Sequence, residues 1–142
     1  MKDFLIRSYA PEDEVAIVAL WNDCSLVFPQ NDPLKDIQRK IRVNPEWFLV
    51  GEIEGRIMSS CMAGYDGHRG NINYLGVHPD FQRNGYAEAL MAEAERLLKE
   101  AGCPKINLCV RTTNTSVVEF YEGIGFSDNG CLSLGKRLIP DD

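Results

Sequence analysis

The chain has 142 residues, a length that suits one compact domain and leaves little room for two. Its net charge of −6 argues against a nucleic-acid binder, because such proteins need a cationic surface that displaces counterions from phosphates. An acidic surface instead favours cationic partners such as amines through long-range steering.

The cysteines indicate a reduced, cytoplasmic protein without a metal site. Their number is odd, no two are spaced as C-x-x-C, and neither His68 nor His78 completes a ligand cluster. Residues 1–7 contain no apolar stretch long enough for a signal peptide, and no run approaches the ~20 apolar residues that cross a bilayer. The five cysteines are Cys24, Cys61, Cys103, Cys109 and Cys131.

The first elements expected along the chain are a strand and two helices. Residues 4–9 are rich in strand formers. Pro11 and the acids that follow open a helix that runs toward Trp21, since proline fits the first helical position and acids favour the positive end of the dipole. Asp32 caps a second helix, whose apolar residues recur at helical spacing over 34–41.

Three strands are expected next. Residues 47–53 and 56–65 are rich in strand formers and flank residues 54–55, which have the composition of a hairpin turn. Residues 66–70 form the next turn, and residues 72–78 are the third of these strands.

The second half of the chain begins with its clearest helix. Apolar residues recur at i, i+3, i+4 and i+7 over residues 87–98, and Gly102 stops the helix. Residues 106–110 are a buried strand. A capping box at Ser116 opens a last helix through Tyr121, and residues 126–138 are predicted to be strand again.

The resulting order is β-α-α-β-β-β-α-β-α-β-β. Because the strands cluster in the middle with helices before and after, the order predicts a mixed α/β (α+β) fold and not a doubly wound sheet. No repeat, low-complexity stretch or linker divides the chain, so residues 1–142 are expected to form a single domain.

The strongest local signal for a binding site is the turn over residues 77–87. A strand ends at Pro79, a polar turn follows, and Gly85 stands where the long helix begins. This arrangement points free backbone N–H groups and the helix dipole at one position, which suits a diphosphate, and Arg83 adds a charged donor. A plain strand-to-helix turn with a glycine is the alternative. The pattern is neither G-x-G-x-x-G nor a P-loop.

Two motifs in the expected order resemble the GNAT superfamily of N-acetyltransferases. The first, Gln82-Arg83-Asn84-Gly85-Tyr86-Ala87, is similar to the superfamily's acetyl-CoA signature Q/R-x-x-G-x-G/A. The second is similar to N-x₆-Y before G-F, and consists of Asn114, Phe120-Tyr121 and Gly125-Phe126. The resemblance spans nearly the whole chain, and it implies a central, mostly antiparallel sheet of six to seven strands with about four helices.

A closer resemblance is to the small bacterial YpeA-type acetyltransferases. It is carried by residues 31–33, 65–70 and 132–138. It does not identify the acceptor.

The resemblance implies acetyl-CoA as co-substrate, with no metal, and assigns roles to single residues. Backbone groups of Leu75 and Val77 pair with the pantetheine arm, and Asn114 bonds it. Tyr121 protonates the departing thiolate, a task that suits a phenol because it holds its proton at neutral pH; a core aromatic is the alternative. The amides of residues 83–88 hold the diphosphate. The cofactor-binding residues of the turn are then Gln82, Arg83, Asn84, Gly85, Tyr86, Ala87 and Glu88.

The chain departs from the superfamily pattern at the general base. Relatives commonly place a glutamate at the start of the fourth strand or on the fifth, where this chain has Asn71 and Cys109. Asp66 and His68 lie in the turn before the fourth strand and are expected to act instead through a water. A solvated loop is the alternative for both residues.

The missing base bears on the acceptor. A lysine amine is neutral in only about one molecule in ~2,500 at pH 7, a penalty of roughly 4.6 kcal/mol, whereas an α-amine is neutral in about one in seven, a penalty of ~1 kcal/mol. A site without a strong base is therefore expected to favour α-amines or weakly basic amines.

The acceptor groove is expected between residues 21–32 and 65–69, by resemblance. Its aromatic and polar side chains are expected to form an aromatic wall and acidic anchors for a cationic acceptor. The alternative is that they are ordinary core and surface residues. These are Phe28, Asn31, Asp32 and Asp66.

Two functions remain open at this point. The first is transfer of an acetyl group to an amine acceptor by direct attack. The second is a non-catalytic acyl-CoA sensor on the same fold, which the missing base favours and the presence of Asn114 and Tyr121 opposes. A homodimer through the C-terminal strands suits this fold, and neither nucleic acid nor a membrane is an expected partner.

Overall fold

The computed structural model describes residues 3–142, which form two compact units. The larger unit comprises residues 3–107 together with 141–142, and the smaller comprises residues 108–140. None of the described helices is both long and apolar enough to cross a membrane. Over the same residues, no group of three or more His, Cys, Asp or Glu side chains is placed to hold a metal ion.

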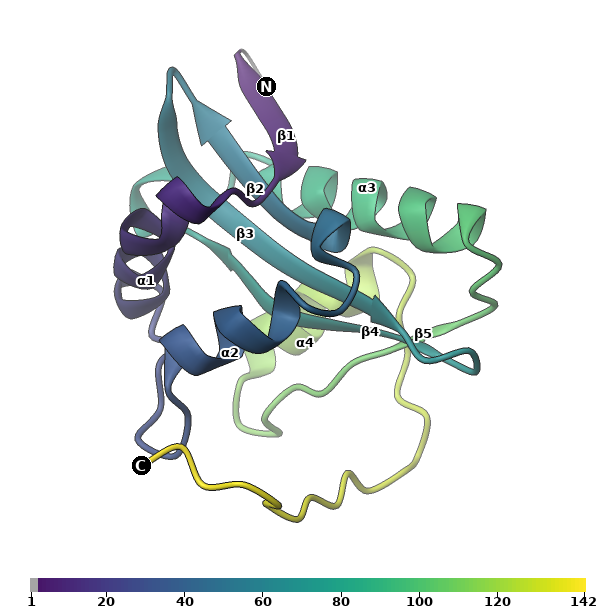
Figure 1. The fold of residues 1–142 in the computed structure, drawn as a ribbon. Coiled ribbons are helices and arrows are strands. Elements are labelled where there is room, and N and C mark those ends of the chain that lie inside the picture. The colour runs from purple at the N-terminus through teal and green to yellow at the C-terminus, as the bar shows by residue number, and fades with distance from the viewer. Residues whose placement is uncertain (1–2) are drawn as a thin grey trace. The chain divides into compact units, whose positions relative to one another are not determined.

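The larger unit is built on a five-stranded sheet in the order β1-β2-β3-β4-β5 (Figure 1). The strands are β1 (Phe4–Ser8), β2 (Phe48–Ile53), β3 (Arg56–Tyr65), β4 (Gly70–Val77) and β5 (Ile106–Asn107). The first four pair as antiparallel neighbours, and β5 joins β4 in parallel. The mixed fold and mostly antiparallel sheet predicted from the sequence are confirmed, with fewer strands and a much shorter β5 than expected.

Three helices pack on this sheet: α1 (Glu14–Asp23), α2 (Pro33–Lys40) and α3 (Tyr86–Glu100). The predicted start signals hold, because a short 3₁₀ turn at Pro11–Asp13 leads into α1 and the Asp32 carboxylate accepts the Leu34 N–H (2.9 Å) at the start of α2. Short 3₁₀ turns also precede β2 (Pro45–Trp47) and follow β4 (Pro79–Phe81).

The sheet is covered on both faces, with α1 and α2 on one and α3 on the other (Figure 1). On the first face, alternate side chains of β2 meet the helices, as expected for a strand whose neighbouring residues point to opposite sides. On the second face α3 buries an apolar stripe of Leu90, Met91, Ala94 and Leu98. The cluster under α1 and α2 consists of Ile17, Leu20, Trp21, Ile37, Phe48, Val50 and Met62.

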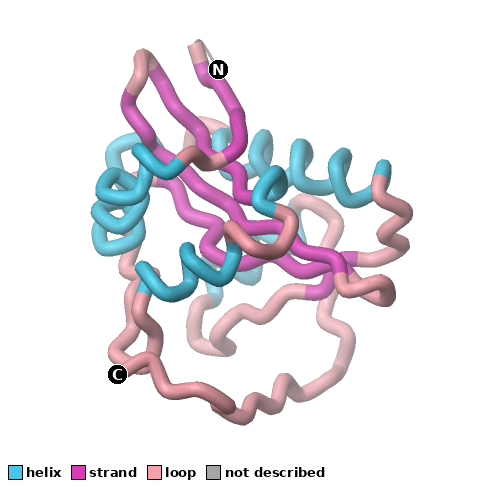
Figure 2. The backbone as a smooth tube through the Cα atoms, in the orientation of Figure 1, coloured by secondary structure: helices cyan, strands magenta, loops and turns pink. Residues whose placement is uncertain are grey.

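The smaller unit contains one helix, α4 (Thr115–Gly123). It begins one residue before the predicted capping box, with Asn114 at the N-cap position, so that Ser116 lies inside its first turn. The strands predicted over residues 126–138 are wrong: residues 124–140 form neither helix nor strand (Figure 2). The apolar side chains of residues 132–139 lie in solvent, as Leu134 shows at 89% exposure, and Asp128 accepts the Gly130 N–H (2.7 Å) in a local turn.

Candidate functional site

Strand β4 has an open edge over most of its length. β5 pairs only with its first two residues, in the pairs Gly70–Ile106 and Asn71–Asn107. Within the described chain, residues 72–77 therefore have no partner strand on the side away from β3. An extended ligand can add to such an edge through main-chain hydrogen bonds.

A β-bulge interrupts β4 in the middle of this open stretch. The register against β3 shifts between Ser60 and Met62, where Tyr74 and Leu75 together oppose one residue. Tyr74 adopts a left-handed backbone with φ of 52°, which is uncommon for a residue with a side chain.

The bulge decides which amides face the open edge. Successive N–H groups of a strand point alternately to its two sides. The Gly70 N–H donates to a carbonyl just before β5 (2.8 Å), whereas the His78 N–H donates to a carbonyl of β3 (2.8 Å). In a regular strand, the N–H groups of two residues eight positions apart would point to the same side. Those of Gly70 and His78 point to opposite sides, because the extra residue of the bulge inverts the alternation. It follows that the N–H groups of Leu75 and Val77 point to the open edge.

The turn after β4 is held by the side chains of two signature residues. The Gln82 side-chain amide donates to the Val77 carbonyl (3.1 Å), and the Asn84 amide donates to the carbonyls of Phe81 and Gln82 (both 3.1 Å). The Val77 carbonyl also accepts the Cys24 thiol (3.4 Å), so its N–H is the backbone group that remains available.

The amides of this turn are free to bind an anion. Arg83 (φ 65°) and Gly85 (φ 82°) are left-handed, and Gly85 is the N-cap of α3. Across the described chain, no acceptor receives a backbone N–H of residues 82–88. Unpaired donors at the positive end of a 15-residue helix suit an anion. After β4 and one 3₁₀ turn, the chain continues through the predicted residues Gln82, Arg83, Asn84, Gly85, Tyr86, Ala87 and Glu88.

A loop after α1 packs closely on β4 beside these amides. A Cβ atom on Gly76 would lie 2.9 Å from Leu26 Cδ1 and 3.3 Å from Cys24 Sγ, so the loop side chains approach the β4 backbone closely at this glycine. Further along this loop Phe28 and Asn31 are half-buried, and the Asp32 carboxylate is engaged in capping α2.

Asp66 and His68 lie at the other end of β4. Asp66 accepts the N–H groups of His68 and Arg69 (both 2.8 Å), and these bonds hold the pKa of its carboxyl below the ordinary value. The side chains of Asp66 and His68 are exposed. At ~3.3 Å per residue, the start of β4 at Gly70 is roughly 16 Å from Leu75, so the fold does not bring this turn to the bulge. Asn71, where the resemblance implies a base in other members of the family, is exposed.

Asn114 and Tyr121 belong to the smaller unit. Asn114 caps α4, and its side-chain oxygen accepts the Ser116 hydroxyl (3.4 Å). Tyr121 is buried on α4, where its ring contacts those of Phe120 (5.2 Å) and Phe126 (5.5 Å) edge-on. Cys109 is exposed, with its thiol near the Ser133 hydroxyl (3.3 Å).

The chain is similar to known proteins in sequence and in fold. A family model described as the acetyltransferase (GNAT) family matches residues 15–126. A protein of Pectobacterium atrosepticum named as an acetyltransferase is 48% identical over 136 residues, which are 96% of this chain and 96% of the relative.

Two solved structures share the fold. AAC(6')-Iy in complex with the bisubstrate analogue CoA-S-monomethyl-acetylneamine has a TM-score of 0.78 at 16% identity, over 96% of this chain and 99% of that one. The ribosomal-protein-S18-alanine N-acetyltransferase of Escherichia coli has a TM-score of 0.74 at 21% identity, over 87% of this chain and 77% of that one.

Proposed function

This chain belongs to the acetyltransferase (GNAT) family of acetyl-CoA-dependent acyltransferases, and we propose that it transfers an acetyl group from acetyl-CoA to an amine by direct attack. In this proposal residues 1–142 act as one domain. The pantetheine arm lies along the open edge of β4, the diphosphate binds the amides of residues 82–88, and Asn114 bonds the pantetheine.

The observation that carries the proposal is that two sets of unpaired backbone N–H groups lie at one end of β4. The N–H groups of Leu75 and Val77 point to the strand's open edge, and the unpaired amides of residues 82–88 follow after one short turn. The first set suits the amide and thioester carbonyls of an extended arm, and the second suits its diphosphate. A single preorganised N–H on the developing oxyanion contributes roughly 10²–10³ to the rate of an acyl transfer.

Tyr121 is the proposed general acid. The amine attacks the thioester carbonyl, the carbon–sulfur bond breaks, and the phenol gives its proton to the departing CoA thiolate. An ordinary phenol remains protonated at neutral pH and can supply the proton in the transition state. The ring of Tyr121 is held on α4 by edge-on contacts with the rings of Phe120 and Phe126.

The acceptor proposed is an α-amine or another weakly basic amine. Asn71 and Cys109 are poor bases, and the hydrogen bonds that lower the pKa of Asp66 make this carboxylate a weaker base as well. One fold neighbour is solved with a CoA-S-monomethyl-acetylneamine analogue and the other is named for an alanine of ribosomal protein S18, so the fold alone does not select an acceptor. The general-base role of Asp66 and His68 stays a prediction, tested by the acid limb of the pH–rate profile in Asp66→Asn and His68→Gln.

Release of the CoA thiol from acetyl-CoA tests the transfer and the role of Tyr121. We expect Tyr121→Phe to lower kcat about 100-fold or more, with the Kd for CoA within a factor of three of wild type, because only a transition-state contact is lost. The matched control is Tyr9→Phe in the larger unit. It also removes only a hydroxyl, and it keeps the ring that stacks on Phe48 (4.5 Å). A Tyr121→Phe enzyme with unchanged kcat would exclude the phenol as the acid.

The same assay addresses the acceptor. Two peptides of one sequence are compared at pH 7, one with a free α-amine and no lysine, the other with a blocked N-terminus and an internal lysine. The proposal expects the first peptide to have the higher kcat/KM by at least tenfold. Equal values would contradict the preference.

An acyl-CoA sensor is the second candidate function, favoured by the lack of a strong base at Asn71 and Cys109. It predicts saturable binding of acetyl-CoA without thiol release across a panel of amines. Turnover that depends on the Tyr121 hydroxyl excludes it.

A further inference from the structure

The strained residue of the β4 bulge is held from one side by an aromatic ring. Tyr74 keeps a left-handed backbone that persists only where surrounding contacts enforce it. Its ring stacks on the Trp21 indole of α1, with centroids 3.8 Å apart and an interplanar angle of 15°. The stacking fixes the side chain but leaves the direction of the peptide groups to other contacts.

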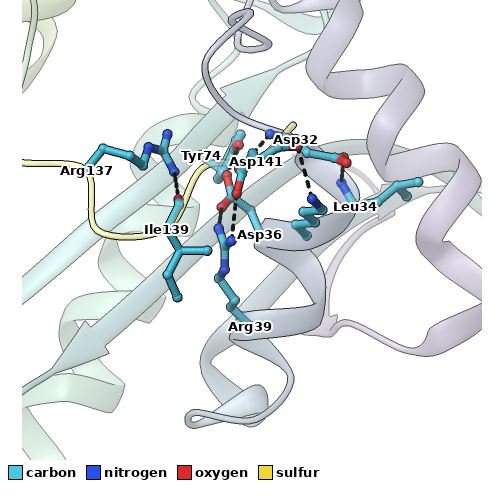
Figure 3. A network of polar contacts seen from close by, with 9 residues as sticks. Asp32, Leu34, Asp36, Arg39, Tyr74, Arg137, Ile139 and Asp141 are labelled. Carbon is cyan, nitrogen blue, oxygen red and sulfur yellow. Dashed lines mark hydrogen bonds and ion pairs between the residues drawn. The ribbon is translucent and has the colours of Figure 1, made fainter.

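A chain of hydrogen bonds fixes these peptide groups. The Ser60 hydroxyl of β3 donates to the Tyr74 carbonyl (2.8 Å) and accepts the Trp21 indole N–H (2.9 Å). At the far end of the Tyr74 side chain, the phenol donates to Asp36 Oδ2 of α2 (2.6 Å; Figure 3). We call Trp21, Asp36, Ser60 and Tyr74 the bulge clamp.

The centre of the bulge clamp is fully buried, so its geometry has little freedom. Trp21 and Ser60 are both 0% exposed. The neighbouring hydroxyl of Ser59 is equally buried but has no hydrogen-bond partner. The two consecutive serines of β3 are equally buried, but they point to opposite faces of the sheet, and only the Ser60 hydroxyl is bonded to the bulge.

Asp36 connects the bulge clamp to the rest of α2. Its other carboxylate oxygen pairs with Arg39 (3.2 Å), and Arg39 in turn pairs with Asp141 (2.6 Å; Figure 3). The phenol of Tyr74 is therefore held by a carboxylate that is itself held in place.

We infer that the bulge clamp aims the Leu75 N–H at the thioester carbonyl, and that Trp21, Ser60 and Tyr74 are positioning residues for the transfer. The inference rests on the proposed function. The bulge inverts the alternation of β4 amides, and without it the Leu75 N–H would point to β3. None of the three residues needs to touch a reactant, because they act through the Tyr74 peptide groups. A small change in the aim of an oxyanion donor affects the rate more than the binding of CoA.

The test compares Ser60→Ala with Ser59→Ala in steady-state kinetics at saturating acetyl-CoA. We expect Ser60→Ala to lower kcat at least tenfold while the Kd for CoA changes less than threefold, since the diphosphate amides are untouched. Ser59→Ala removes an unbonded hydroxyl at the same depth and is expected to keep both values within twofold. Equal kcat values in the two variants would overturn the inference.

A second pair of variants keeps the test decisive if Ser60→Ala fails to fold. Tyr74→Phe retains the ring on Trp21 and loses only the bond to Asp36, and is expected to lower kcat several-fold at an unchanged Kd for CoA. Asp36→Asn keeps a carbonyl acceptor for the phenol and is expected to retain most of the rate. Loss of CoA affinity in parallel with kcat in Tyr74→Phe would indicate a purely structural role. If the wild type releases no thiol, the proposed function is contradicted. If Tyr74→Phe has the kcat of the wild type, only the role of the bulge clamp is contradicted.

Discussion

Two left-handed residues shape the turn between β4 and α3. Arg83 has φ of 65° and Gly85 has φ of 82°, and together they turn the amides of residues 82–88 outward. Such a backbone carries a penalty of roughly 1–2 kcal/mol for a residue with a side chain, whereas glycine adopts it freely. Gly85 is thus the position of the signature where the residue type is fixed by the backbone.

Replacement of Gly85 by alanine should weaken CoA binding. We expect Gly85→Ala to raise the Kd for CoA at least tenfold, measured by calorimetry, because the substitution strains the turn and disturbs its amides. The matched control is Gly55→Ala in the β2–β3 hairpin, where φ is 79° and no atom would touch the added Cβ. Both variants should lose about 1 kcal/mol of stability, but only Gly85→Ala should lose affinity; equal affinity for CoA would count against the anion site.

At the residue scale the sequence predicted the turn and missed the bulge. Gln82 and Gly85 stand at fixed spacing in one short segment, so a local pattern is enough to find them. Tyr74 in a strand rich in apolar residues looks ordinary, because a bulge depends on the register with β3 and on the contacts of Ser60 and Trp21. These partners lie 14 and 53 positions away in the chain, beyond the reach of any local pattern.

At the element scale an ion pair fastens the start of α1 to the sheet. Arg7 of β1 binds both carboxylate oxygens of Asp13 (2.7 and 3.0 Å) and also Glu52 of β2 (3.1 Å). Asp13 further accepts the Ala10 N–H (2.8 Å) and is 6% exposed. The hydrogen bonds from Arg7 lower the pKa of Asp13, against the opposing effect of burial.

The contribution of Asp13 to stability should depend on pH. Because its pKa is lower in the folded than in the unfolded chain, the stabilisation is present above the unfolded value of about 3.9 and is lost as the pH falls through the folded value. We expect Asp13→Asn to lower the free energy of unfolding by about 1–2 kcal/mol at pH 7, allowing for the partial solvent exposure of Arg7. In urea denaturation this difference should shrink below pH ~4. The exposed Glu12→Gln is the control, and a difference independent of pH would contradict the linkage.

Helices proved easier to predict than the last strands. Capping residues such as Asp32 and the apolar stripe of α3 act within one element, so a short segment carries the whole signal. The alternation of apolar and small residues around Leu132 and Leu134 resembles the pattern of a strand. A strand also needs a partner strand, and no local pattern specifies where that partner lies. Leu132 and Leu134 remain 89% exposed, and a homodimer that would cover them stays a prediction.

At the scale of the molecule, the end of the chain returns to the larger unit. The Asp141 side chain is 4% exposed, binds Arg39 (2.6 Å) and accepts the Asp32 N–H (2.8 Å), while Lys35 donates to its carbonyl (3.0 Å; Figure 3). Residues separated by more than 100 positions are thereby joined at the start of α2.

Removal of this anchor should destabilise the larger unit. We expect Asp141→Ala to lower Tm by a few degrees, in line with the loss of a charge-assisted hydrogen bond to the Asp32 N–H, about 1–3 kcal/mol. The neighbouring Asp142→Ala removes an exposed carboxylate and should leave Tm unchanged. A Tm for Asp141→Ala equal to that of Asp142→Ala would show that the contacts at α2 contribute nothing to stability.

The sequence alone does not indicate these contacts of Asp141, because acidic residues at this place are ordinary in a chain of net charge −6.

The most direct measurement is the backbone amide ¹H–¹⁵N spectrum of the protein during titration with CoA. Binding along the open edge of β4 and in the turn predicts saturable shifts at residues 75, 77 and 82–88, with the hairpin amides of residues 54–55 unchanged. CoA that binds without moving these signals, or that does not bind at all, would contradict the proposed site.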